Sequence, residues 1–245
     1  MTGLLMTGRL PADAVTAGRD PAVTAWTALV PAKPFALAKS RCADLTPVAR
    51  RALARAMLTD VVTRLGAVPS VHAVVVVGGG PEVTGTALAS GAAAFTTTHG
   101  PGLNAETADA LAALDGPARR FAVVMGDLPG AAPADFAAAL AAAGRHGGPA
   151  LVADAEGTGT TLLALPGPQE FRPFLGPGSR GRFLAAGYRE LDVPAASPLR
   201  RDIDTVEQLL ALPAATLGPA TRAWLAAREP ARPAARTRIP EVAAL

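Results

Sequence analysis

The stretch Arg119-Arg120-Phe121-Ala122-Val123-Val124-Met125-Gly126-Asp127-Leu128-Pro129 decides the fold of this 245-residue chain. Its five consecutive apolar residues, Phe121 to Met125, predict a parallel strand that is covered on both faces. Gly126 then lets the backbone turn, so that Asp127 projects from the carboxyl end of the strand. Ligands bind at that end of the strands in open α/β sheets. Asp127 is therefore a candidate metal ligand, although it could equally be the cap of the helix that follows.

Strands and helices alternate around this stretch. Thr46 and Pro47 have the residue types of an N-cap and a first helical position, so they predict the start of a long helix. The alternation predicts a doubly wound α/β sheet, and a hairpin after it makes the sheet a mixed one. We expect strands at 25–30, 71–77, 92–96, 121–125, 150–153 and 162–165, and helices from Pro47 to about Leu65 and at 82–90, 104–114, 133–145 and 205–212, with a last one around Trp224.

Length and composition favour one globular domain. Half of the residues are hydrophobic, which suffices for one sizeable core. We expect a mobile leader at 1–24, the domain at 25–227 and a Pro/Arg-rich tail at 228–245. No apolar run reaches membrane-spanning length and no signal peptide is recognisable, so the sequence predicts a cytoplasmic protein that contacts no membrane.

The charge balance argues against nucleic-acid binding. The formal net charge is +3, and the tail contributes four arginines and two glutamates to it. About +1 remains for the rest of the chain, which is too little for a nucleic-acid-binding face. The single cysteine, Cys42, excludes an internal disulfide, and we interpret it as a packing residue.

A cationic loop follows the first strand. The only two lysines of the chain, Lys33 and Lys39, lie in it together with Arg41. Ammonium and guanidinium groups neutralise the charge that develops on a transferred phosphoryl group. The loop therefore indicates a polyanion site, and the alternative is a solvated surface loop.

Two further segments could contact a nucleotide. The run Gly78-Gly79-Gly80 ends the second strand, where glycines permit close approach by a planar base or a phosphate. The only asparagine, Asn104, precedes a helix, so it is a candidate N-cap and also a candidate ligand through its amide.

Glycine-rich and acidic motifs dominate the second half of the chain. The segment 174–182 combines glycines with Ser179, Arg180 and Arg182, which suits a small acid with a carboxylate and a phosphate, although it could be an ordinary connector. Asp202 and Asp204 lie just before a helix with a capping box formed by Thr205 and Gln208. With Asp127, one of these two aspartates could hold Mg²⁺, which prefers carboxylate and phosphate oxygens.

Six motifs in order resemble one enzyme family. The chain is similar to the phosphoenolpyruvate and 2-phospho-L-lactate guanylyltransferases of coenzyme F420 biosynthesis over about residues 26 to 212. The motifs are P-A-K-x-x-x-x-A-K-S-R at 31–41, G-L-N at 102–104, G-D-L-P at 126–129, E-G-T-G-T-T at 156–161, F-L-G-P-G-S at 174–179 and R-D-I-D-T at 201–205.

The resemblance implies a single-domain, Rossmann-like nucleotidyltransferase fold of the glycosyltransferase-A type, with GTP and Mg²⁺. It implies that GMP is transferred to the phosphate of a three-carbon acid, with release of pyrophosphate. By this similarity the Mg²⁺ ligands are Asp127 and one of Asp204, which we favour, and Asp202. The acid is expected at Thr161, Gly176 and Ser179, the GTP phosphates at Lys33, Lys39 and Arg41, and the nucleoside near Asn104.

The chemistry agrees with the scarcity of acid and base residues. A phosphate that attacks is already ionised near neutral pH, so positioning and charge neutralisation dominate. The sequence accordingly offers no convincing Ser/His/Asp or Cys/His set. Two alternatives remain: the same chemistry on 2-phospho-L-lactate or 3-phosphoglycerate, and a nucleotide-binding module without activity. A monomer and a homodimer are both open.

Overall fold

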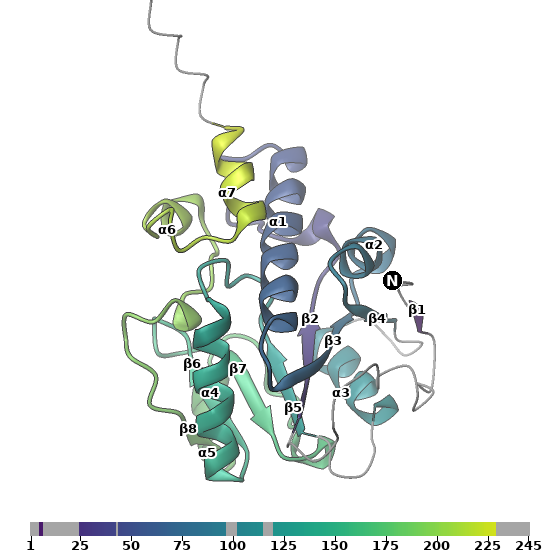
Figure 1. Cartoon of the computed structure of the whole chain (residues 1–245), viewed down its shortest axis with the longest axis vertical. Coiled ribbons are helices and arrows are strands. Elements are labelled where there is room, and N and C mark those ends of the chain that lie inside the picture. Colours follow the sequence, from purple (N-terminus) through teal and green to yellow (C-terminus); the bar gives the residue numbers. More distant parts are fainter. Residues whose placement is uncertain (1–4, 7–24, 43, 97–101, 115–119, 229–245) are drawn as a thin grey trace, which may run out of the picture.

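The computed structural model describes residues 5–6, 25–42, 44–96, 102–114 and 120–228. Within them, eight strands form one sheet in the order β1-β4-β3-β2-β5-β7-β6-β8, flanked by seven α-helices (Figure 1). The predicted mixed α/β sheet is thus confirmed. The strands are β1 (Leu5–Met6), β2 (Trp26–Pro31), β3 (Val71–Val77), β4 (Ala93–Phe95), β5 (Arg120–Val124), β6 (Ala150–Ala153), β7 (Thr160–Leu165) and β8 (Arg189–Glu190). The helices are α1 (Pro47–Gly66), α2 (Gly80–Ala89), α3 (Leu103–Ala113), α4 (Pro133–His146), α5 (Ser179–Ala185), α6 (Val206–Leu210) and α7 (Pro219–Ala226).

The strand directions bring several loops to one edge of the sheet. We call the edge at which β2, β3 and β5 end the functional edge. β2 is parallel to both of its neighbours, β3 and β5, and all six of its residues are buried. β7 is antiparallel to β5 and β6, so it begins at the edge where β2, β3 and β5 end. The predicted hairpin of β6 and β7 is confirmed. Loops from both halves of the chain therefore meet at this edge.

Helix α1 forms as its sequence predicts. The Thr46 side chain accepts a hydrogen bond from the Ala49 amide, and Pro47 occupies the first turn. Leu58, Val61 and Leu65 pack into the main core against the sheet. One buried polar residue of α1, Asp60, accepts hydrogen bonds from two backbone amides at the start of α7, so α7 lies beside α1 (Figure 1).

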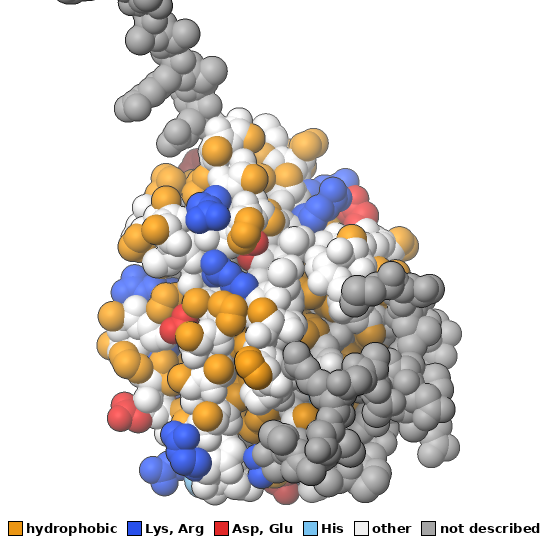
Figure 2. All heavy atoms as spheres, in the orientation of Figure 1, with side chains coloured by type: hydrophobic (Ala, Val, Ile, Leu, Met, Phe, Trp, Pro, Cys, Tyr) orange, Lys and Arg blue, Asp and Glu red, His pale blue; other side chains and the backbone are white. Residues whose placement is uncertain are grey.

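The predicted leader and tail lie almost entirely outside the described residues. Leu5–Met6, within the leader, pair with β4 in parallel. None of the described helices has both the length and the apolar character needed to cross a bilayer. On the face shown in Figure 2, Lys and Arg side chains form several separate groups, and hydrophobic and acidic side chains lie between these groups.

Candidate active site

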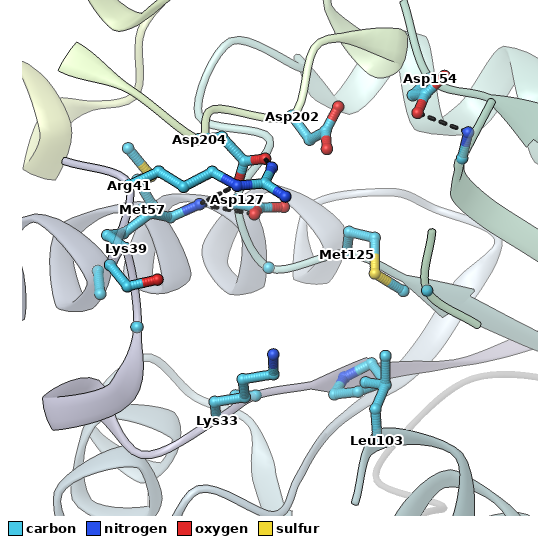
Figure 3. A pocket seen from close by; sticks show the side chains of 18 of the residues that line it. Lys33, Lys39, Arg41, Met57, Leu103, Met125, Asp127, Asp154, Asp202 and Asp204 are labelled. Atoms are coloured by element: carbon cyan, nitrogen blue, oxygen red, sulfur yellow. Dashed lines mark hydrogen bonds and ion pairs between the residues drawn. The ribbon is translucent and has the colours of Figure 1, made fainter. Parts of the chain in front are cut away.

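The loops at the functional edge enclose a cavity of about 500 Å³. Its walls come from the loop after β2, the turn after β5, the β6–β7 turn, the segment before α5 and the segment before α6 (Figure 3). Eight of the predicted site residues line it, namely Lys33, Lys39, Arg41, Asp127, Gly176, Ser179, Asp202 and Asp204.

The ammonium group of Lys39 lies between the two predicted metal ligands, Asp127 and Asp204. Lys39 Nζ donates to Asp127 Oδ2 at 2.6 Å and lies 4.0 Å from Asp204 Oδ1. It also donates to the Ile203 carbonyl oxygen, and the Lys39 side chain is only 8% exposed. Asp127 caps no helix, because α4 begins after Ala132. The cap interpretation of Asp127 is therefore wrong.

Backbone hydrogen bonds fix the two acidic segments to each other. The Ile203 amide donates to the Asp127 carbonyl oxygen at 3.0 Å. The predicted capping box of α6 is present, and Gln208 Oε1 accepts from the amides of both Asp204 and Thr205. The position of Asp204 relative to Asp127 is thus set by the main chain.

The other two predicted cations differ in their partners. Arg41 forms an ion pair with Asp204 through NH1, and its side chain is 70% exposed. Lys33 forms no hydrogen bond or ion pair with another described residue, and Figure 3 shows its side chain directed into the cavity. Lys33 is therefore available for an anionic ligand without breaking an existing ion pair.

Asp202 is the residue of the acidic cluster whose pKa is raised. Burial, and then the neighbouring carboxylates of Asp127 and Asp204, raise the pKa of Asp202 to about 7. Its side chain points toward the cavity (Figure 3). The carboxylates of Asp127, Asp202 and Asp204 therefore lie close enough to repel one another, although Lys39 and Arg41 form ion pairs with two of them.

These observations fit a divalent cation. The donors are hard carboxylate oxygens, and an ammonium group already stands between two of them as a cation would. The described residues contain no group of three or more Asp, Glu, His or Cys that could hold a metal ion by themselves. Mg²⁺ is commonly held by one or two carboxylates together with substrate phosphates, so Asp127, Asp204 and a bound nucleotide form a suitable set.

Asp154 is a site residue that the sequence reasoning missed. Its carboxylate accepts hydrogen bonds from the Thr158 and Gly159 amides at 2.9 and 2.6 Å and so closes the β6–β7 turn. It lines the cavity with Thr160. Its position in the sequence could have indicated a site residue, because Asp154 directly follows strand β6 and Asp127 lies in the turn after strand β5.

The threonine that lines this wall of the cavity is not the predicted one. Thr160, and not the predicted Thr161, lines the cavity. Ser179 Oγ donates to Thr160 Oγ1 at 3.0 Å, whereas Thr161 Oγ1 donates to the Val152 carbonyl oxygen at 3.4 Å. Successive strand residues point to opposite faces, so only one of the two threonines can present its hydroxyl here. Contact of Thr161 with the acid stays a prediction.

The segment before α5 is held by the side chains that were expected to bind ligands. Asn104 donates to the Leu175 carbonyl oxygen and accepts from the Leu175 amide, at 3.0 and 2.9 Å. It does not cap α3, whose N-cap is Gly102, so that interpretation is wrong. Contact of Asn104 with the nucleoside stays a prediction.

The two arginines of this segment also have protein partners. Arg182 NH2 donates to the carbonyl oxygens of Phe174 and Pro177, and Arg180 pairs with Glu190 at 2.7 Å. They stabilise the loop that carries Gly176 and Ser179, and the charge of Arg180 is paired within the protein. Cys42 is buried, as predicted, and burial raises the pKa of its thiol.

Comparison with known proteins agrees with this geometry. The profile of the family described as "Guanylyl transferase CofC like" matches residues 26–178. The phosphoenolpyruvate guanylyltransferase of Thermomonospora curvata is 40% identical over 220 residues, covering 89% of this chain and 95% of the relative.

Two solved structures share the fold at low identity. A protein of Desulfovibrio desulfuricans G20, assigned as a nucleotide-diphospho-sugar transferase, superposes with a TM-score of 0.59 at 16% identity, over 82% of this chain and 94% of its own. CMP:2-keto-3-deoxy-manno-octonic acid synthetase, solved with CTP, has a TM-score of 0.51 at 15% identity, over 83% of this chain and 99% of its own. The predicted nucleotidyltransferase fold is confirmed, and the chain belongs to the CofC-like guanylyl transferase family.

Proposed function

We propose that this protein transfers GMP from GTP to the phosphate of phosphoenolpyruvate, giving enolpyruvyl-diphospho-5'-guanosine and pyrophosphate in coenzyme F420 biosynthesis. Membership of the family and the name of the Thermomonospora curvata relative support the reaction. The observation that carries the proposal is the cavity itself, in which oxygens of Asp127 and Asp204 lie within 4.0 Å of one ammonium nitrogen. We place the reaction in the cytoplasm, because both substrates are charged metabolites.

The reaction is an in-line displacement at the α-phosphorus of GTP. An oxygen of the acid's phosphate forms a new bond to this phosphorus while the bond to the oxygen that bridges the α- and β-phosphates breaks. Pyrophosphate leaves with the electron pair of the broken bond. The attacking oxygen is already ionised, so the protein needs to position the reactants and neutralise charge rather than remove a proton.

The cavity offers separate groups for the two substrates. Lys33 and the exposed Arg41 can approach the triphosphate, and Lys39 can do so when its bonds to Asp127 and Ile203 are replaced. On the opposite wall, the Gly176–Ser179 turn and Thr160 face the space left for the acid. The positive φ of Gly176, +119°, is a conformation that favours glycine.

Asp127 and Asp204 would hold Mg²⁺, with Asp202 beside them. The ion would neutralise phosphate charge as it develops, and it would replace the Lys39 ammonium as the partner of the two carboxylates. The raised pKa of Asp202 supports this assignment, because a divalent cation would relieve the crowding of carboxylates.

Pyrophosphate release tests the proposal. Purified protein with GTP and phosphoenolpyruvate is expected to release pyrophosphate only when Mg²⁺ is present, with the product identified by mass. Asp127→Asn should lower turnover at least about 100-fold, while Asp192→Asn, at an exposed aspartate remote from the cavity walls, should not. GTP binding without turnover of any acid would instead support a non-catalytic nucleotide-binding module.

Parallel assays identify the substrates. Phosphoenolpyruvate is expected to give faster turnover than 2-phospho-L-lactate or 3-phosphoglycerate, and GTP faster turnover than CTP. Preference for another acid would overturn the assigned acid and leave the nucleotidyl transfer in place.

A further inference from the structure

One carboxylate outside the acidic cluster lies behind the cavity wall formed by Ala32 and Leu103. Glu106 lies in the first turn of α3 and is half-buried. Its Oε2 atom is so close to Gly78 that a methyl group at Gly78 would lie 2.4 Å from it. The Glu106 side chain forms no hydrogen bond or ion pair with another described residue. Its carboxylate can therefore accept hydrogen bonds from a ligand without breaking an existing one.

The surroundings of Glu106 form part of the cavity wall. Leu103, one helical turn earlier on α3, lines the cavity, and so does Ala32. The Ala32 carbonyl oxygen would lie 3.2 Å from the same methyl group at Gly78. Figure 3 shows Leu103 and Lys33 across the cavity from Asp202 and Asp204. Glu106 therefore lies next to the wall residues at the end of the cavity that is remote from the proposed metal ligands.

Three glycines beside Glu106 form a turn without side chains. Gly78, Gly79 and Gly80 follow β3 with φ values of +82°, +80° and +73°, a region that favours glycine. A Cβ at Gly80 would meet no atom within 4 Å, whereas Gly78 is buried against Glu106 and a Cβ at Gly79 would meet Val83. The open space beside this turn therefore lies at Gly80.

A carboxylate in such a place selects among bases. It only accepts hydrogen bonds, and guanine presents two adjacent donors, the N1–H and the N2 amine. Adenine and cytosine each present an unprotonated ring nitrogen beside their amine, which a carboxylate repels. We propose that Glu106 accepts both hydrogen bonds from guanine and thereby makes the site selective for GTP. This inference rests on the proposed function and adds the residue that determines the base.

The chain order agrees with this assignment. Ala32 lies next to the Gly78 turn, and Lys33 follows it directly. A nucleotide whose base meets Glu106 therefore extends its triphosphate past Lys33 toward Arg41 and the carboxylates of Asp127 and Asp204.

Nucleotide binding with Glu106→Gln tests the inference. Dissociation constants are measured by calorimetry with Mg²⁺ and without acid, for GTP, ITP, XTP and ATP. The wild-type protein should bind GTP more tightly than ITP, which lacks the N2 amine, and ATP most weakly. Glu106→Gln should weaken GTP binding about 10- to 100-fold, because a charge-assisted pair of hydrogen bonds is lost.

XTP provides a test that a merely structural role would not pass. Xanthine has an oxygen where guanine has the N2 amine, so it repels a carboxylate but accepts from the glutamine amide. Glu106→Gln should therefore bind XTP more tightly than the wild-type protein does. Glu82→Gln, a nearly isosteric change on α2 at an exposed residue that faces Arg55, is the matched control and should change no ranking.

The outcomes separate this inference from the proposed function. Unchanged preference for GTP in Glu106→Gln, or equal weakening of all four nucleotides, would overturn the role of Glu106 while pyrophosphate release by the wild-type protein continues to support the reaction. A wild-type protein that binds ATP as tightly as GTP would overturn the inference without any variant. If the wild-type protein turns over no nucleotide with any acid, the proposed function itself fails.

Discussion

Lys39→Met should destabilise the protein when no metal ion is present, and Mg²⁺ should reverse much of the loss. The Lys39 ammonium group is the buried cation between Asp127 and Asp204, and its nitrogen lies 2.6 and 4.0 Å from their carboxylate oxygens. Methionine preserves much of the length of the buried stem but leaves Asp127 without a counter-charge and Asp204 with only the exposed Arg41 as its partner. The perturbation therefore removes one charge and keeps the packing nearly constant.

The size of the effect follows from the burial of the three groups. A charge-assisted hydrogen bond contributes about 1.5–3 kcal/mol, and breaking a fully buried ion pair costs about 3–5 kcal/mol. Asp127 and Asp204 keep 28% and 38% of their side-chain exposure, so water screens part of the loss. We expect the free energy of unfolding to fall by about 2–3 kcal/mol, which lowers Tm by about 4–12 °C for a chain of this size.

Thermal unfolding of the wild-type protein and of Lys39→Met, with and without Mg²⁺, measures the loss of stability and its reversal. In the wild-type protein the ion must displace the buried ammonium group of Lys39, whereas in Lys39→Met only the exposed Arg41 competes with it, at Asp204. Mg²⁺ alone should therefore raise the Tm of the variant by more than that of the wild-type protein.

Lys33→Met is the matched control for Lys39→Met. It removes the same side chain from the same cavity, but Lys33 has no partner among the described residues, so its stability should change by less than about 0.5 kcal/mol. Equal destabilisation by the two substitutions, or an equal Mg²⁺ effect on the Tm of Lys39→Met and of the wild-type protein, would refute the reasoning.

Two further substitutions test the framework of the site. Asp60→Ala removes the acceptor of two buried backbone amides at the start of α7, so chemical denaturation should show a loss of about 2–4 kcal/mol, and a loss below about 0.5 kcal/mol would contradict this account. Gly159→Ala places a methyl group 2.4 Å from Asp154 Oδ2, so it should raise the KM for the acid and destabilise by about 1–3 kcal/mol. Its control, Gly85→Ala inside α2, meets no atom within 4 Å and should be neutral or stabilising, so similar KM changes in both variants would count against the role given to the turn.

The fold could be predicted because its signals are local. The run Val71–Val77 is apolar except for His72 and forms β3 with those bounds. The caps Thr46 and Thr205 bond the amides that their positions predict. Convergence of distant motifs on one cavity followed from a general property of α/β sheets, in which parallel strands end at the same edge.

The errors concern side chains whose partners are distant in the sequence. Asn104 was expected to cap its own helix, but its amide bonds both backbone groups of Leu175, 71 residues away. Arg180 was expected near an acid, but Glu190 on β8 supplies a carboxylate within the protein. Periodicity and cap preference carry no information about such pairs, because they depend on how the elements pack.

The two sides of the cavity differ in how firmly the backbone holds them. The carboxylates belong to segments joined by the hydrogen bond between the Ile203 amide and the Asp127 carbonyl oxygen, and Gln208 Oε1 accepts hydrogen bonds from the amides of Asp204 and Thr205. Lys39 instead lies in an irregular loop with φ +54°, an unusual conformation for a residue with a side chain. Its ammonium group is held mainly by the acidic segments it neutralises. A competing divalent cation therefore changes the partners of Lys39 more readily than it changes the spacing of the carboxylates, so the acidic side sets the geometry and the lysine adapts to it.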